Sequence, residues 1–157
     1  MAYRRKSWRE KLADDKDLPR VFKISGDKIR KWGDGTMVIP APREVDGLMR
    51  TVRKGRLVTI NELRQALARK HKATSGCPIT TGIFAWIAAH AAEEASLAGA
   101  KRVTPYWRTL KVGGELNPKY PGGIATVRAK LESEGHKIMQ KGKRWLVLDY
   151  EKALAKL

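Results

Sequence analysis

Neighbouring aromatic, basic and acidic residues in the last third of the chain have the types needed to bind nucleic-acid bases. Tyr106 and Trp107 are adjacent in the sequence. Aromatic rings stack on unpaired bases, and each stacked base contributes roughly 1 to 3 kcal/mol to the free energy of binding. The alternative for this pair is an extended segment on which one ring packs into the core. Cys77 is the only cysteine, and it is either an unusual nucleophile or a small, buried turn residue.

The charge of the chain sets the class of partner. The sequence has 33 Lys and Arg against 16 Asp and Glu, a net charge of +17 over 157 residues, and 42% of its residues are hydrophobic. Such a chain folds, so its excess charge must lie on a folded surface that attracts phosphate polymers. Charge alone does not separate DNA from RNA, the ribosome or an anionic membrane. The three histidines have no metal-ligand spacing, so we expect neither a metal nor a cofactor.

The sequence has no apolar stretch of bilayer length and no signal-peptide core behind its charged N-terminus. We therefore expect a cytoplasmic, nucleoid-associated protein that makes no membrane contact and is a monomer.

Local signals predict several helices. A capping box at Ser7 and Glu10 predicts a short helix after a basic arm formed by the first six residues. Residues 37–39 are expected to form a strand and residues 42–52 a helix with one buried face. Thr59 and Glu62 form a second capping box, at the start of a helix that runs to about residue 72.

A long helix follows the turn formers at 73–78. We expect it to begin at Thr80 or Thr81 and to end near Gly99, with Glu93 and Glu94 as a solvated patch. Its predicted core stripe consists of Ile83, Phe84, Ile87, Ala88, Ala91 and Ala95. Residues 124–134 predict one more helix, and residues 136–148 a basic hairpin.

Together these elements predict an α+β, mostly helical fold. The helices on either side of the 73–78 turn form a helix-turn-helix, and the terminal hairpin is its wing. We assign residues 51–157 to this winged-helix domain and residues 1–50 to a short extension packed on it.

Residues 52 to about 147 resemble the DNA-binding domain of the methylguanine-DNA alkyltransferases, in particular the alkyltransferase-like branch that lacks the acceptor cysteine. The resemblance rests on five motifs in family order: Arg-Lys-Gly-Arg-Leu-Val-Thr-Ile-Asn-Glu-Leu at 53–63, Gly76-Cys77-Pro78, Pro105-Tyr106-Trp107-Arg108, Tyr120-Pro121-Gly122-Gly123, and Glu134-Gly135.

Departures from the family pattern bear on the chemistry. Alkyl transfer needs a thiolate and a neighbouring base, but Tyr106 stands in place of the cysteine and Trp107 in place of the histidine. The resemblance places Gly82 where the family carries the arginine that fills the gap left by a flipped base. Ile60 stands where the family carries the tyrosine that rotates the nucleotide. Neither alkyl transfer nor base flipping by the family's own means is therefore expected.

The resemblance implies a non-catalytic protein that binds duplex DNA, recognises an alkylated or distorted base, and marks the site for other repair factors. The helix N-terminus, the charge of the terminal hairpin and the resemblance together give the expected DNA-contacting residues: Thr59, Ile60, Gly76, Thr80, Thr81, Gly82, Ala85, Lys141, Lys143 and Arg144. The pocket for the modified base would be lined by Tyr106, Trp107, Arg108, Tyr120, Gly122, Gly123 and Glu134.

Three alternatives remain at this point. The first is a winged-helix regulator or architectural protein that ignores lesions. The second is an enzyme, either a transferase using Cys77 or a nuclease or glycosylase using Glu134. The third is RNA or ribosome binding, because phosphate-directed charge does not choose between nucleic acids.

Overall fold

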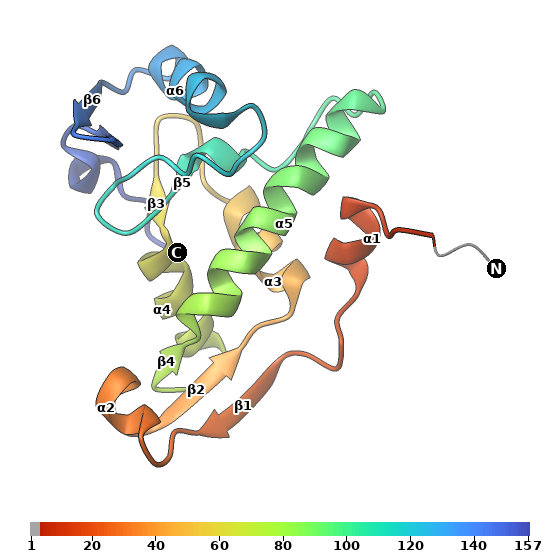
Figure 1. Cartoon of the computed structure of the whole chain (residues 1–157), viewed down its shortest axis with the longest axis vertical. Helices are drawn as coiled ribbons and strands as arrows, with labels where there is room; N and C mark the ends of the chain where they lie inside the picture. The colour runs from red at the N-terminus through yellow and green to blue at the C-terminus, as the bar shows by residue number, and fades with distance from the viewer. Residues whose placement is uncertain (1–3) are drawn as a thin grey trace.

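Two helices joined by a turn lie at the centre of the computed structural model, which describes residues 4–157 (Figure 1). They are α4 (Ile60–Lys70) and α5 (Pro78–Leu97), and they form the predicted helix-turn-helix. The remaining helices surround this pair: α1 (Trp8–Ala13), α2 (Lys28–Trp32), α3 (Pro42–Arg50) and α6 (Gly123–Ser133). The α+β class and the helix-turn-helix are thus confirmed. No helix among residues 4–157 combines the length and apolar character needed to cross a bilayer.

Three small sheets complete the fold. The first consists of β1 (Arg20–Lys23), β2 (Thr36–Ile39) and β4 (Ser75–Gly76), in which β2 pairs antiparallel with β1 and parallel with β4. In the second, β3 (Val58–Thr59) runs parallel to β5 (Thr109–Leu110). The third is the predicted wing, formed by β6 (Ile138–Lys141) and β7 (Arg144–Val147). Two short 3₁₀ turns, η1 (Tyr106–Arg108) and η2 (Tyr150–Ala153), precede β5 and follow β7.

Side-chain caps fix where the helices begin. The Thr59 N–H donates to Glu62 at 2.9 Å, and the full capping box predicted there is present. At Ser7 only half of the predicted box forms: its hydroxyl accepts the Glu10 N–H at 3.1 Å, while the Glu10 carboxylate pairs with Arg4. Helix α5 corrects the prediction, because it begins at Pro78 with Cys77 as its N-cap rather than at Thr80 or Thr81. Proline at the first helical position has no N–H to leave unsatisfied.

One main core joins the elements on both sides of residue 50. Val45 and Met49 of α3 are fully buried in the same cluster as Leu63, Ala88 and Leu131. Helix α3 is therefore an integral part of the core and not an added layer. The predicted stripe on α5 is partly wrong: Ile83 is 45% exposed, whereas Phe84, Ala88 and Ala91 are buried.

Helix α1 is attached to α5 by aromatic and polar contacts. The Trp8 ring stacks on His90 with centroids 4.4 Å apart and meets Trp86 edge-on at 4.8 Å. Glu94 accepts the backbone N–H groups of Trp8 and Arg9, so it is not the solvated residue that we predicted. Of the predicted basic arm, residues 1–3 lie outside the described part, while Arg4 forms an ion pair with Glu10 and Lys6 one with Asp14.

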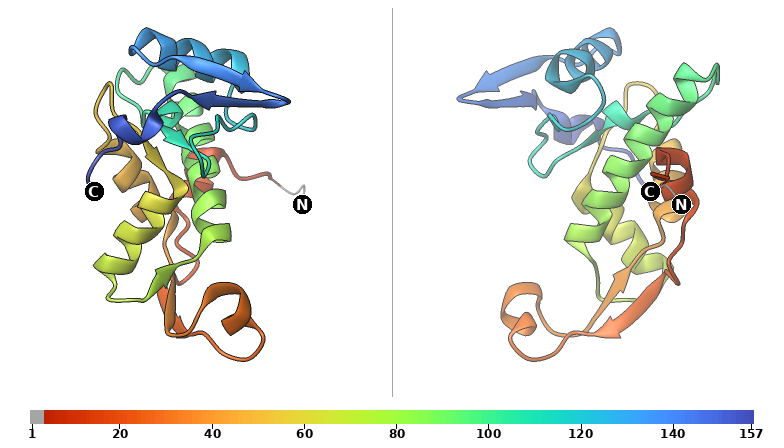
Figure 2. Two further views of the ribbon diagram at one scale, coloured as in Figure 1. Left: turned by 90° about the vertical axis from the view of Figure 1, so that its left-hand side faces the viewer. Right: turned by 45° about the vertical axis from the view of Figure 1, so that its right-hand side comes forward.

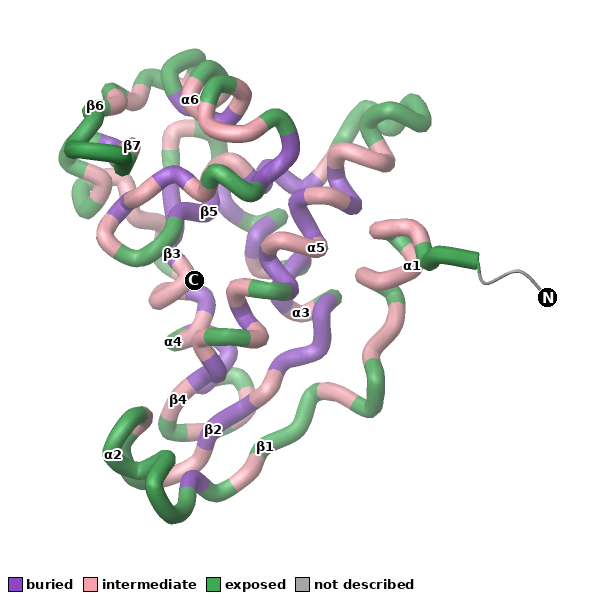
Figure 3. Tube along the Cα trace, viewed as in Figure 1, coloured by how far each residue is buried: buried purple, intermediate pink, exposed green. Residues whose placement is uncertain are grey.

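Two hairpins extend from opposite ends of the molecule toward the same side (Figure 2, right). One is the wing, residues 138–147. The other, which we call the first hairpin, comprises β1, α2 and β2, residues 20–39. Helix α4 and the N-terminal half of α5 lie between them, while α1 and the loop after α5 lie on the other side. The chain is exposed along α2 and around the wing's turn (Figure 3).

Candidate nucleic-acid interface

Helix α5 exposes one apolar stripe to solvent. Ile79 is 55% exposed and Ile83 is 45% exposed, and Gly82 and Trp86 are partly exposed on the same face. These positions follow the i, i+3, i+4, i+7 spacing of a single helix face. No Lys or Arg occurs between residues 78 and 97. The helix therefore offers shape and apolar contact to a ligand, but no positive charge.

Four of the predicted DNA-contacting residues are buried, and their side chains are not presented to a ligand. Thr59 is 3% exposed because it caps α4, and Thr81 and Ala85 are fully buried on the core side of α5. Gly76 lies in β4, where a Cβ would come within 2.7 Å of the Arg64 carbonyl oxygen. This glycine permits the close approach of the turn to α4.

Three further predicted contacts are partly exposed. Ile60 and Gly82 border the cleft described next. Thr80 is partly exposed, but its hydroxyl oxygen is buried without a hydrogen-bond partner among the described residues. That hydroxyl does not face a ligand in this conformation.

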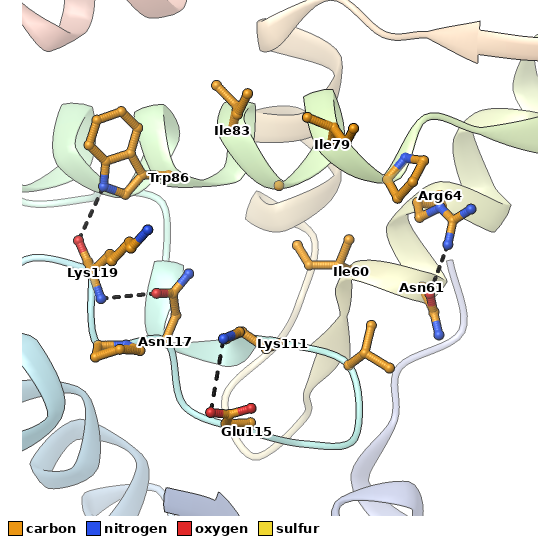
Figure 4. A pocket seen from close by; sticks show the side chains of 14 residues that line it. Ile60, Asn61, Arg64, Ile79, Ile83, Trp86, Lys111, Glu115, Asn117 and Lys119 are labelled. Carbon is orange, nitrogen blue, oxygen red and sulfur yellow. Dashed lines mark hydrogen bonds and ion pairs between the residues drawn. The ribbon is translucent and has the colours of Figure 1, made fainter. Parts of the chain in front are cut away.

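A cleft of about 770 Å³ lies between α5, the start of α4 and the 111–119 loop (Figure 4). Its apolar walls come from Ile60, Ile79, Ile83, Trp86 and Val112. The Trp86 indole N–H donates to the Lys119 carbonyl at 3.2 Å and so joins the loop to the helix. The polar residues that line the cleft are Asn61, Arg64, Lys111, Glu115, Asn117 and Lys119.

The wing carries the predicted positive charge at its turn. Lys141 and Lys143 are exposed, and neither forms an ion pair with any residue in 4–157. Arg144 is exposed as well, but it donates to Glu115 at 3.2 Å. Lys141 and Lys143 are therefore the wing residues with charge available for a phosphate.

Two of the three aromatic residues of the predicted base pocket fill the core, while the third, Trp107, is partly exposed and lines a shallow surface pocket with Arg108. Tyr106 is 1% exposed and Tyr120 is 3% exposed, and their rings meet edge-on with centroids 5.8 Å apart. Burial, together with the charge of Glu93, raises the pKa of Tyr106 to about 12. Burial also raises the pKa of Tyr120. A phenol in this state remains protonated and is a poor nucleophile.

The polar residues of the predicted pocket bind one another. Arg108 donates to Glu134 through two nitrogens, at 2.7 and 2.9 Å, and to the Val52 carbonyl at 2.7 Å. The Trp107 indole N–H donates to the same carboxylate at 3.0 Å. Burial alone would raise the pKa of Glu134, but the bonds from Arg108 and Trp107 outweigh it and hold that pKa below its usual value. This cluster connects η1, the end of α6 and the segment before β3.

Gly122 and Gly123 also have structural roles. Gly122 is the N-cap of α6 with φ +79°, and a Cβ there would clash with Thr126. Gly123, with φ +68°, is the first residue of that helix. Both glycines adopt a left-handed backbone that other residues rarely take.

The residues proposed for enzymatic alternatives are not available for chemistry. Cys77 is 7% exposed and packs with Ile24 and Met37. The Glu134 carboxylate is occupied by Arg108 and Trp107. Within residues 4–157, no group of three His, Cys, Asp or Glu side chains is placed to hold a metal ion.

Sequence reasoning missed the charge of the first hairpin. Arg20, Lys23, Lys28, Arg30 and Lys31 are all exposed, and the same segment contains only two acidic residues, Asp27 and Asp34. The available signal was this local excess of basic residues. Residues 20–35 show no helical or strand periodicity, so the sequence alone does not place these basic residues on one surface.

Comparison with known proteins identifies no family for this chain. No known family profile matches it, and no curated protein is a significant match to its sequence. Among solved structures, a match is S. pombe Atl1 in complex with damaged DNA containing O6-carboxymethylguanine. The two chains are 17% identical, the match covers 74% of this chain and 94% of that one, and the TM-score is 0.49. A likeness at this level carries no argument about function, which rests on the residues described above.

Proposed function

We propose that this protein binds duplex DNA through the exposed face of α5 and the wing, and that it transfers no alkyl group. The observation that carries the proposal is the pair of unpaired lysines, Lys141 and Lys143, on a hairpin that follows a helix-turn-helix. Lysines in a wing contact backbone phosphates and release condensed counterions. The net charge of +17 favours the same class of partner.

The residues on α5 suit recognition of groove shape more than hydrogen bonding to base edges. The bidentate contacts of direct readout come from Arg, Lys, Asn and Gln side chains, and α5 contains none of them, while the hydroxyls of its two threonines are buried. Exposed isoleucines instead resemble the apolar wedges that press into a minor groove and partly unstack a base step. Ile79 and Ile83 would make this contact, while Lys141 and Lys143 of the wing would supply the positive charge.

A modified base would enter the cleft in front of α5. Ile60, Ile83 and Trp86 provide an apolar wall suited to an alkyl group and to the face of a base. The polar edge at Asn117 and Lys119 provides groups for hydrogen bonding. The resemblance to the alkyltransferase-like branch suggests that a modified base is bound, whereas its place in this cleft rests on the cleft's lining and differs from the predicted Tyr106 pocket.

The test is an anisotropy titration of matched duplexes that contain either guanine or one O6-alkylguanine at the same position. The wild type should bind both duplexes and bind the modified one more tightly. Ile83→Ala should reduce that preference, while Leu97→Ala, at an 81% exposed position outside the cleft, should leave it unchanged. Failure to bind either duplex would overturn the proposed function. A gain in protein mass after incubation with alkylated DNA would overturn the non-catalytic assignment.

A second candidate is duplex binding without lesion recognition. It is favoured by the closed Tyr106–Tyr120 contact and by the occupied Glu134 carboxylate. Equal affinity for the two duplexes would select this candidate. Binding selection from random duplexes would then distinguish a regulator, which enriches one sequence, from an architectural protein, which does not.

A further inference from the structure

The first hairpin carries positive charge that the described part of the chain does not neutralise. Arg20, Lys23, Lys28, Arg30 and Lys31 are exposed, and none of them forms an ion pair within residues 4–157. The Lys28 and Lys31 ammonium groups lie 5.9 and 5.3 Å from the Trp32 ring centroid. Both ammonium groups therefore lie near the same ring at α2, and both lysines remain exposed to solvent.

The hairpin is held against the turn of the helix-turn-helix. Strand β2 pairs with β4 within that turn, and the Cys77 N–H donates to the Val38 carbonyl at 2.9 Å. Thr36 and Thr74 exchange two hydrogen bonds, each from a backbone N–H to the other's hydroxyl, at 3.0 and 3.1 Å. Cys77 is the N-cap of α5, so the hairpin is fixed directly at the start of that helix.

The arrangement of the hairpins places positive charge at both ends of the exposed face of α5. The wing and the first hairpin extend to the same side, with α4 and the N-terminal half of α5 between them (Figure 2). Helix α5 itself has no basic residue. A duplex lying against α5 therefore meets lysines and arginines on either side of the contact.

We propose that the first hairpin is a second wing, which contacts the duplex backbone at the end of the binding site opposite the C-terminal wing. The inference rests on the proposed duplex binding and adds a second phosphate-binding surface to it. Lys28, Arg30 and Lys31 of α2 make the contact, because they are exposed on the helix that caps the hairpin. Each phosphate that they neutralise steepens the salt dependence of binding.

The test compares three variants of the full chain on one duplex of about 20 base pairs, or two helical turns. The first-hairpin variant carries Lys28→Gln, Arg30→Gln and Lys31→Gln, which keep good helix formers in α2. The wing variant carries Lys141→Gln and Lys143→Gln. The control variant carries Lys16→Gln, Lys101→Gln and Arg102→Gln, which remove three exposed charges from the segments after α1 and α5 on the other side of the molecule.

The first-hairpin variant should bind the duplex at least about ten-fold more weakly than the wild type. The slope of the logarithm of its binding constant against the logarithm of the salt concentration should be smaller in magnitude by about 2 to 3. The control should change affinity by no more than about three-fold, through the general loss of charge. Backbone footprinting should show two protected segments for the wild type and only one for the first-hairpin variant.

The inference fails if the first-hairpin variant binds as well as the control while the wing variant is weakened. The proposed function fails if the wild type does not bind the duplex. Circular dichroism of each variant separates loss of contact from loss of folding.

Discussion

Glu134 binds two other residues of the predicted base pocket, Trp107 and Arg108, and these contacts indicate a structural role. Its side chain is 7% exposed and that of Arg108 is 14% exposed. Removing one partner of such a pair leaves the other charge buried without compensation. In the pocket that we predicted, Tyr106 and Tyr120 are therefore packed in the core, and Glu134 is held by its hydrogen bonds to Arg108 and Trp107.

Glu134→Gln should lower the free energy of unfolding by about 3 kcal/mol, because it leaves the Arg108 guanidinium without its charged partner. The matched control is Glu132→Gln, two residues earlier. Glu132 is 46% exposed and pairs with Arg128 on the helix surface, so its loss should cost less than about 0.5 kcal/mol. Urea denaturation measures both values. Equal effects at the two positions would show that the Arg108–Glu134 pair contributes little to stability.

The lowered pKa of the Glu134 carboxyl also makes the stability of the fold depend on pH. The pKa of Glu134 is lower in the folded protein than its usual 4.5, so the unfolded chain takes up the proton first as the pH falls. The stability from this carboxylate is therefore fully present above about pH 4.5 and is lost as the pH falls through the folded pKa. Denaturation curves of the wild type and Glu134→Gln should converge below pH 4.5. A constant difference from pH 7 to pH 3 would contradict this prediction.

Tyr106→Phe should leave stability unchanged or raise it by up to about 1 kcal/mol. The Tyr106 hydroxyl is buried and has no hydrogen-bond partner in the described structure, so its removal relieves an unsatisfied group. Tyr106→Ala should instead cost about 3 to 5 kcal/mol, because it leaves a cavity beside Trp107 and Tyr120. Both values come from urea denaturation. Loss of duplex binding in a folded Tyr106→Phe protein would restore a functional role to the hydroxyl.

At the scale of elements, the position of the first hairpin depends on its contact with Thr74. Gly35 lies where a Cβ would approach the Thr74 hydroxyl within 2.3 Å, and its φ is +113°. Gly33→Ala is a matched control, since Gly33 also has positive φ, +82°, but open space around it. Both substitutions cost about 1 kcal/mol or more through the backbone, and only Gly35→Ala also disturbs the Thr36–Thr74 bonds.

Gly35→Ala should therefore weaken duplex binding by more than Gly33→Ala does, at similar helical content. Anisotropy titration and circular dichroism measure the two quantities. If both variants bind alike, the attachment at Thr74 does not position the hairpin for DNA.

All the α-helices that the structure describes except α2 were predictable, because their signals are local. Capping boxes at Ser7 and Thr59, and the turn formers between α4 and α5, mark boundaries within a few residues. The strand at 37–39 and the hairpin of the wing were predicted, but the parallel pairings of β2 with β4 and of β3 with β5 were not predictable. Strands β3 and β5 have two residues each and pair across a long stretch of chain, so neither carries a periodicity of its own.

The candidate site was only partly predictable for a related reason. Most of α5 is apolar on all sides, so no polar face marks which side meets solvent, and Ile83 was assigned to the core. Thr81 and Ala85 were expected to contact DNA, but the packing of α5 buries both. The lysines of the wing were placed correctly at the surface, because a Lys-Gly-Lys turn is a local signal of a hairpin.

At the scale of the whole molecule, positive charge and apolar contact surface are separated along one side. The exposed stripe of α5 is uncharged, and the basic hairpins stand at the two ends of the molecule (Figure 2). A ligand that contacts all three regions at once must span the distance between the hairpins and carry negative charge at both ends. Duplex DNA has this combination, since its persistence length far exceeds the size of one domain.

This arrangement predicts a dependence of affinity on duplex length. A duplex of roughly one helical turn, about 10 base pairs, can lie on α5 and one hairpin, whereas about 20 base pairs can reach both. A longer duplex also offers more overlapping positions at which the protein can bind, which by itself raises the apparent affinity slightly. The wild type should gain more affinity between these lengths than this statistical factor explains.

The variant with Lys28→Gln, Arg30→Gln and Lys31→Gln should lack that additional gain, because one of its two contacts with the DNA backbone is gone. The control variant at Lys16, Lys101 and Arg102 should keep it, since those residues belong to the segments that follow α1 and α5 and not to either hairpin. Anisotropy titrations over a series of lengths measure the gain, and an equal gain in all three proteins would mean that only one end of the molecule holds the duplex.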